Sequence, residues 1–178
     1  MGREIRRVPK GWEHPQKERC PHWGGLDAHG EPGDYQHRKC FKSLYDKDFE
    51  TAAREWISNF EAFQRGEHPK QDWIQKFYKY YWEYDGPPDV DYYREIAWTE
   101  AEATCYQIYE TVSEGTPTSP VFETLDEMRV WLIQQGYSEK AAENFTKDGW
   151  VPSAVYTPET GFISGIEVAG LDLPKKDE

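Results

Sequence analysis

The sequence predicts a mixed α+β fold, with an irregular N-terminal arm, a helical hairpin and a small antiparallel sheet packed with helices. Apolar residues recur every three or four positions between residues 48 and 84, as on one face of a helix. They alternate with polar residues between residues 104 and 112, as in a strand. Aromatic residues are 16% of the 178 residues, and a few can form a core because each buries roughly 150–250 Å².

Residues 1–46 are predicted to be an irregular arm. Proline and glycine recur in this segment at short intervals, and both residue types interrupt helices and strands. An irregular segment of this length is unusual inside a compact domain. Two arrangements remain open: the arm wraps the body through Trp12, Trp23 and Tyr35, or a bound metal holds it.

The metal alternative rests on a C-x-H pair and an H-x-x-C pair, which flank a glycine-rich loop within the arm. Zinc takes four thiolate or imidazole ligands in a tetrahedron. The sequence therefore suggests a structural zinc site, the one cofactor it indicates, made of Cys20, His22, His37 and Cys40. The C-x-H pair is tighter than the usual C-x-x-C spacing, so a solvated loop without metal is the competing interpretation.

An aromatic-rich helical hairpin is predicted over residues 47–103. The first helix spans residues 48–65 and stops at Gly66, and the second spans residues 70–84. Proline cannot continue a helix, so the Asp-Gly-Pro-Pro sequence that follows ends the second one. The short connection favours an antiparallel pair. Residues 89–103 form either a short helix or an ordered loop.

Residues 104–170 are predicted to form a β-α-α-β-β module. The strand at residues 104–112 precedes two helices, whose starts are marked by a capping box at Thr124 and by Ser138. Two strands then follow at residues 153–157 and 162–168. A hairpin turn at residues 158–161 joins them.

The boundaries complete the predicted organisation. Residues 46 onward form one compact domain, and residues 171–178 are a flexible tail. Cys105 fits a buried position in the strand pattern. The turn at residues 113–120 contains Pro117-x-x-Pro120, which either offers a polyproline surface to a partner or is a structural loop.

The net charge of −12 is unevenly distributed. Residues 1–42 carry +3 and residues 43–178 carry −15. Direct binding to nucleic acid is disfavoured, because phosphate neutralisation needs a cationic face. Only one short cluster supplies cations, namely Arg3, Arg6, Arg7 and Lys10. The acidic remainder is either a solvated surface or one that imitates nucleic acid or meets a basic partner.

Carboxylates and aromatic residues alternate after the second predicted helix, and tyrosine and tryptophan are favoured anchors at protein interfaces. We expect a partner-binding surface here. Its members are Tyr84, Asp85, Asp89, Asp91, Tyr92, Tyr93, Glu95 and Trp98. A solvated acidic face, acid–base chemistry and a divalent-cation site are the alternatives.

The sequence contains no strong catalytic signature. It has no G-x-S-x-G element, no phosphate-binding glycine loop and no histidine beyond residue 68, so a non-enzymatic function is favoured. No apolar run approaches the roughly 20 residues of a membrane span, and no signal peptide opens the chain. Three cysteines, an odd number, favour a reducing cytoplasm.

Three segments together resemble a group of small uncharacterised bacteriophage and prophage proteins. The segments are GREIRRVP, which starts at Gly2, YQIYETVSEGTPTSPVFET, which starts at Tyr106, and GWVPSAV, which starts at Gly149. The resemblance covers both ends of the chain and, more loosely, the aromatic helices between them. It implies a viral accessory protein in the host bacterial cytoplasm. It assigns no catalytic residue. The resemblance implies cysteine-rich turns after the opening motif in some relatives. Here Trp23 stands where a second cysteine would complete a zinc pair, and this departure weakens the zinc interpretation.

The leading hypothesis is a phage protein that binds a host or phage protein through its acidic aromatic surface. Inhibition of a host defence enzyme or a nucleic-acid-handling enzyme is its most concrete version. A virion structural or assembly component is the first alternative. A metal-dependent enzyme, such as a nuclease, is the second. The sequence indicates neither the partner nor the oligomeric state.

Overall fold

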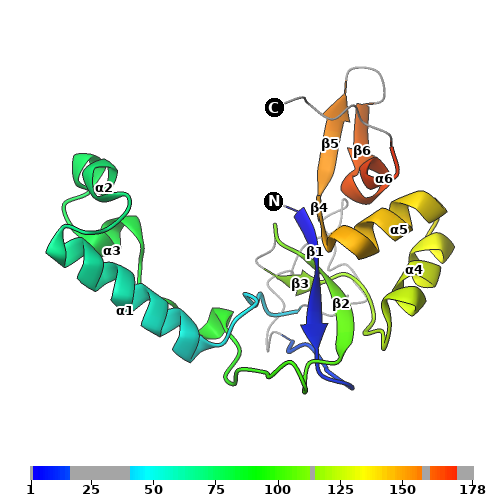
Figure 1. Cartoon of the computed structure of the whole chain (residues 1–178), viewed down its shortest axis with the longest axis horizontal. Helices are drawn as coiled ribbons and strands as arrows, with labels where there is room; N and C mark the ends of the chain where they lie inside the picture. Colours follow the sequence, from blue (N-terminus) through cyan, green and yellow to red (C-terminus); the bar gives the residue numbers. More distant parts are fainter. Residues whose placement is uncertain (1, 17–40, 113–114, 158–160, 172–178) are drawn as a thin grey trace, which may run out of the picture. The chain divides into compact units, whose positions relative to one another are not determined.

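The computed structural model describes residues 2–16, 41–112, 115–157 and 161–171. The chain divides into two compact units, each with its own contacts (Figure 1). Unit 1 comprises Met1–Ser43 and Glu100–Glu178, and unit 2 comprises Leu44–Thr99. This division differs from the expected single domain from residue 46 onward, because unit 1 is completed by residues from the start of the chain.

Unit 1 is built on a four-stranded antiparallel sheet with the order β3-β2-β1-β4. The strands are β1 (Gly2–Val8), β2 (Cys105–Glu110), β3 (Thr116–Pro117) and β4 (Trp150–Pro152). The α+β class and the β2 strand are confirmed. The expectation that the arm is irregular from residue 1 is wrong for Gly2–Val8, which pairs with both β2 and β4 in the middle of the sheet.

One face of this sheet packs on two helices, α4 (Leu125–Gln134) and α5 (Glu139–Asp148) (Figure 1). Ile108 of β2 lies in the core with Met128 and Leu132 of α4 and Phe145 of α5. Each of these side chains is almost fully buried. Because adjacent residues of a strand point to opposite faces, Gln107 and Tyr109 lie on the other face of the sheet.

The predicted starts of both helices are confirmed. Thr124 Oγ1 accepts the Glu127 amide at 3.1 Å, and Ser138 Oγ accepts the Ala141 amide at 3.2 Å. Such caps satisfy backbone donors that have no partner within the helix. The capping box at Thr124 departs from the expected reciprocal form, because the Glu127 carboxylate accepts the amide of Glu123 instead.

A separate hairpin is formed by β5 (Ala154–Thr157) and β6 (Gly161–Ser164), which pair antiparallel as predicted. The predicted strand at residues 162–168 is wrong beyond Ser164, where α6 (Gly165–Ala169) begins. Gly165 donates its amide to the Ser153 carbonyl at 3.2 Å, and Ile166 is buried in the core. The helical conformation of α6 buries Ile166 in the core of unit 1, and this tertiary packing prevails over the local strand pattern of the sequence.

Unit 2 begins with α1 (Phe49–Arg65), whose predicted bounds are confirmed. Asp48 accepts the Thr51 amide at 2.9 Å as the N-cap. Hydrogen bonds from Thr51 lower the pKa of the Asp48 carboxyl, and burial opposes this shift without cancelling it. Gly66 ends the helix with φ +77°, a conformation that glycine adopts without strain.

The predicted second helix is instead two short ones, α2 (Gln71–Phe77) and α3 (Tyr81–Tyr84). The prediction of one helix over residues 70–84 is wrong at residues 78–80. Tyr78 is extended, with φ −132° and ψ +138°. The Glu83 carboxylate accepts the amides of Lys79 and Tyr80 at 2.8 and 3.0 Å, which offsets the backbone bonds lost at the break.

Both short helices lie beside the C-terminal half of α1 (Figure 1). Tyr81 of α3 is 1% exposed and its ring contacts those of Trp56, Phe60 and Phe63 on α1. Its hydroxyl donates to Asp85 at 3.0 Å, and burial raises its pKa strongly. The helical hairpin is therefore held by aromatic contacts, which suits a unit with few buried aliphatic side chains.

Candidate functional site

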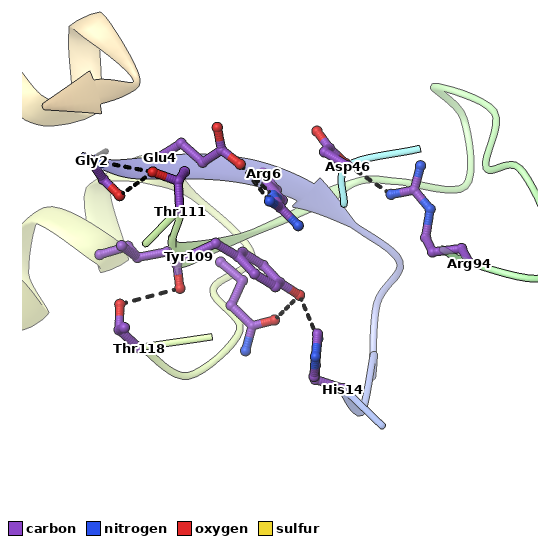
Figure 2. Close-up of polar contacts among 11 residues, drawn as sticks. Gly2, Glu4, Arg6, His14, Asp46, Arg94, Tyr109, Thr111 and Thr118 are labelled. Carbon is purple, nitrogen blue, oxygen red and sulfur yellow. Dashed lines mark hydrogen bonds and ion pairs between the residues drawn. The ribbon is translucent and has the colours of Figure 1, made fainter. Parts of the chain in front are cut away.

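The segment after α3 is ordered by backbone hydrogen bonds to the start of unit 2. The Tyr45 amide donates to the Tyr92 carbonyl at 2.8 Å, and the Phe49 amide donates to the Arg94 carbonyl at 2.9 Å. Arg94 also forms an ion pair with Asp46 at 2.9 Å (Figure 2). The segment contains one 3-10 turn, Val90–Tyr92. Both predicted alternatives for residues 89–103 therefore hold in part.

Residues 89–96 form a surface that we call the acidic strip. Its carboxylates are Asp89, Asp91 and Glu95, all exposed. None of the three forms an ion pair with the described residues. Exposed apolar side chains lie next to them in the sequence, of which Val90 is 55% and Ile96 is 73% exposed. Tyr92 is exposed as well.

The other four residues predicted to bind a partner contact other side chains of unit 2 and have structural roles. Tyr84 packs against Trp73 and Tyr81. Asp85 accepts the Tyr81 hydroxyl, and its carbonyl accepts the Trp56 indole N–H at 2.8 Å. The two remaining residues, Tyr93 and Trp98, are partly buried.

Ring contacts account for this burial. Tyr93 packs on Tyr45 and Phe49, and burial raises the pKa of its phenol. Trp98 lies under the Arg94 guanidinium, 4.1 Å from the ring centroid. The structure therefore brings Asp89, Asp91, Tyr92 and Glu95 into one exposed strip, and places the other four predicted residues beneath or beside it.

The described residues line small hollows, of which two are relevant here. One, of 140 Å³, lies between α1 and the acidic segment and is lined in part by Trp56, Asp85 and Tyr93. The other, of 220 Å³, lies in unit 1 beside Arg3 and Tyr137. Both are below the roughly 300–1,000 Å³ of sites for drug-sized ligands. The exposed strip is therefore a better candidate site than either hollow.

Sequence reasoning missed a second surface of unit 2, which we call the basic aromatic strip. It comprises the exposed cations and rings of residues 70–82. Its rings are Trp73, Phe77, Tyr80 and Trp82, of which Trp73 is 51% and Phe77 is 59% exposed. Its cations are Lys70, Lys76 and Lys79. Averaging charge over the whole acidic region concealed this local excess of lysine.

The cations predicted from the N-terminal cluster are mostly neutralised within unit 1. Arg3 pairs with Glu110 at 3.1 Å, and this contact raises its pKa against the opposing effect of burial. Arg6 pairs with Glu4 at 2.6 Å, and Lys10 pairs with Glu123 at 2.8 Å. Arg7 donates to the Glu100 carbonyl. The cluster therefore offers little positive charge to a ligand.

The polar face of the sheet is covered by the rest of the arm that the structure describes. Trp12 donates its indole N–H to the Tyr109 hydroxyl at 3.1 Å, and His14 Nδ1 lies 3.2 Å from the same hydroxyl (Figure 2). Tyr109 donates to Gln107 at 2.8 Å. The expected wrapping through Trp12 is confirmed, whereas Trp23 and Tyr35 lie outside the described residues.

The turn after β2 has a structural role where the structure describes it. Ser119 Oγ accepts the Ile108 amide at 2.9 Å. Gly115 has φ +88°, a conformation that glycine tolerates without strain. Pro117 belongs to β3, and so one end of the P-x-x-P sequence is part of the sheet.

Cys105, the first residue of β2, is buried, as expected.

The zinc prediction cannot be compared with the fold, because Cys20, His22, His37 and Cys40 all lie outside the described residues. Within the described ranges, no group of three or more His, Cys, Asp or Glu side chains could hold a metal ion. In the same ranges, no helix is both long and apolar enough to cross a membrane.

Comparison of the chain with protein-family models, with curated proteins and with solved structures finds no match. The resemblance to small phage proteins therefore stays a prediction from the sequence. Functional inference rests on the geometry of the two strips.

Proposed function

We propose that the protein is a non-enzymatic binding protein that uses its acidic strip to engage a basic surface on another protein. In the proposed setting the chain is phage-encoded and acts in the cytoplasm of a bacterial host. The partner is then a host or phage protein, and inhibition of a host defence or nucleic-acid-handling enzyme is the most concrete outcome. The observation that carries the proposal is the exposure of Val90, Tyr92 and Ile96 beside three exposed carboxylates that form no ion pair with the described residues.

The apolar members supply the affinity in this proposal. Apolar surface removed from water contributes roughly 25 cal/mol per Å², and tyrosine is favoured at interface centres. Exposure of single apolar residues is ordinary. Three within seven consecutive residues, on a segment whose one helical turn, Val90–Tyr92, leaves them exposed, are better explained as a docking surface.

The carboxylates supply the choice of partner. Asp89, Asp91 and Glu95 carry charge that no described cation neutralises, and a basic partner would complement it. Complementary charge raises association rates and rejects partners of like charge. The backbone bonds from Tyr45 and Phe49 hold the strip in place before binding, which lowers the ordering cost of association.

The proposal is tested by capture from host lysate with three full-length baits at moderate salt. The first bait is the wild-type chain, and the second carries Asp91→Asn, Glu95→Gln and Ile96→Ser. The control bait carries Glu61→Gln and Glu67→Gln, which remove exposed carboxylates from elsewhere in unit 2. A protein held by wild type and control and lost from the strip variant is expected, with identification by mass spectrometry.

Identical captured proteins on all three baits would contradict the proposal, as would capture by none of them. Circular dichroism of the strip variant checks that its fold is retained. All three substituted side chains are exposed, so a loss of folding is not expected. Recovery of the chain in purified virions with structural proteins would favour an assembly role instead.

A further inference from the structure

The basic aromatic strip has a composition opposite in charge to the acidic strip. Over residues 70–82 it presents three lysines and a single carboxylate, Asp72. Lys70, Lys76 and Lys79 form no ion pair with the described residues. The local charge is therefore positive within a strongly acidic chain, and intramolecular carboxylates do not neutralise it.

Each of these lysines lies close to an aromatic ring. The Lys76 ammonium is 5.4 Å from the centroid of Phe77, and the Lys79 ammonium is 5.0 Å from that of Tyr80. The Lys70 ammonium donates to the hydroxyl of Tyr84 at 3.3 Å. Cation–π attraction of this kind holds the charges beside the rings, so cations and flat apolar faces are offered together.

The exposed rings form two pairs. Trp73 and Phe77 of α2 have centroids 5.2 Å apart. Tyr80 and Trp82 stack at 4.6 Å with an interplanar angle of 9°. The break between α2 and α3 positions the second pair, because the Glu83 carboxylate holds the amides of Lys79 and Tyr80. The irregular backbone at residues 78–80 thus has a direct consequence for this surface.

We infer that the basic aromatic strip binds single-stranded nucleic acid, with bases stacking on the exposed rings and phosphates meeting the lysines. Proteins that bind single strands combine aromatic stacking platforms with a cationic track along the backbone. An acidic protein segment would match the lysines but would leave the stacked rings without flat partners. This site goes beyond the proposed protein-binding function and uses different residues.

The inference is tested by fluorescence anisotropy of the full chain with a labelled single-stranded oligothymidylate of about 20 nucleotides, longer than most single-strand binding sites. Binding that weakens with salt is expected, with a slope of log affinity on log salt of about −2 for three lysines. Replacement of both tryptophans, Trp73→Ala and Trp82→Ala, is expected to weaken binding about tenfold or more.

A second variant, Lys76→Gln with Lys79→Gln, is expected to keep the fold and to reduce the salt slope by about 1.4. The control, Asp91→Asn with Glu95→Gln, alters only the acidic strip and should bind at least as tightly as wild type. Absence of binding at low salt would overturn the inference. Tryptophan replacement without effect would also overturn it.

Two further ligands separate nucleic acid from other anions. An abasic oligonucleotide of the same length should bind at least tenfold more weakly, because it offers phosphates without stacking faces. Polyglutamate should not displace the oligothymidylate at equal charge concentration. If the abasic strand binds equally, or polyglutamate displaces the oligothymidylate, then the strip recognises charge alone and the assignment to nucleic acid is wrong.

Discussion

The imidazole of His14 and the phenol of Tyr109 meet at 3.2 Å beneath the arm of unit 1. Tyr109 has one hydroxyl proton and two acceptors within reach of it: Gln107 Oε1 at 2.8 Å and, in the neutral Nε2–H tautomer, His14 Nδ1 at 3.2 Å. His14 Nε2 lies 2.7 Å from the Lys42 carbonyl, so Nε2 must carry a proton. This pair links the start of the chain to β2 and to residues that follow the glycine-rich loop.

Stability is expected to fall at mildly acidic pH because of His14. Burial lowers the pKa of its imidazole, the Lys42 carbonyl raises it, and the Arg6 charge lowers it. Arg6, which is paired with Glu4, and the Tyr109 phenol are the titratable groups near this imidazole among the described residues.

A depressed folded-state pKa means that the unfolded chain binds this proton more readily. The contribution of His14 is then complete above the ordinary histidine pKa of about 6.5 and is lost as pH falls below it. Urea unfolding at several pH values, with wild type and His14→Gln, measures the difference. The same pH dependence in both proteins would show that His14 does not cause it.

Replacement of the central phenol, Tyr109→Phe, is expected to destabilise the protein by about 1–3 kcal/mol. The cost arises because buried His14 and Gln107 and partly buried Trp12 lose a common hydrogen-bonding group while the ring packing remains. Chemical denaturation measures the free energy of unfolding. Tyr92→Phe is the control, since that side chain is exposed, and an equal loss in both variants would contradict the account.

Gly165 at the start of α6 should not tolerate a side chain. A Cβ there would lie 1.4 Å from the Pro152 carbonyl oxygen, so the backbone must shift. Gly165→Ala is expected to cost about 1–3 kcal/mol or more, as in overpacked cores. Gly86→Ala is the matched control, because nothing lies within 4 Å of its Cβ. Thermal unfolding distinguishes them, and a neutral Gly165→Ala would refute the packing of α6 on β4.

The zinc prediction is tested by elemental analysis of the native, untagged chain. If the four predicted ligands hold zinc, about one zinc per chain is expected, to be lost in Cys20→Ser and in Cys40→Ser. Cys105→Ala is the control, because Cys105 is buried in β2 away from the predicted ligands in sequence. A metal content that does not depend on Cys20 and Cys40, or the absence of metal, would refute a site formed by these ligands.

Local signals account for the parts of the fold that sequence could predict. The bounds of α1 follow from its apolar spacing, from the cap Asp48 and from Gly66. The starts of α4 and α5 follow from Thr124 and Ser138. Each of these signals acts within a few residues, so it can be recognised without knowing the tertiary structure.

Long-range pairing explains what the sequence did not predict. The sequence of Gly2–Val8 is rich in charged residues and lacks a local strand signal. The segment is nevertheless a strand, because it pairs with β2 and β4, which lie about a hundred residues or more further along the chain. The break at residues 78–80 depends on the Glu83 carboxylate as a cap. Only four of the eight residues predicted to bind a partner lie in the exposed strip. The partial burial of Tyr84, Asp85, Tyr93 and Trp98 depends on ring contacts, hydrogen bonds and a cation–π contact that composition does not reveal.

The most direct measurement of the central claim is photocrosslinking in bacteria that produce the full chain. A photoreactive benzoylphenylalanine replaces Tyr92 in the acidic strip, and in a control it replaces Tyr156, an exposed residue of β5 in unit 1. The account predicts a discrete crosslinked protein adduct from position 92 that is absent from position 156. No adduct at position 92, or the same adduct from both positions, would contradict the acidic strip as the partner-binding surface.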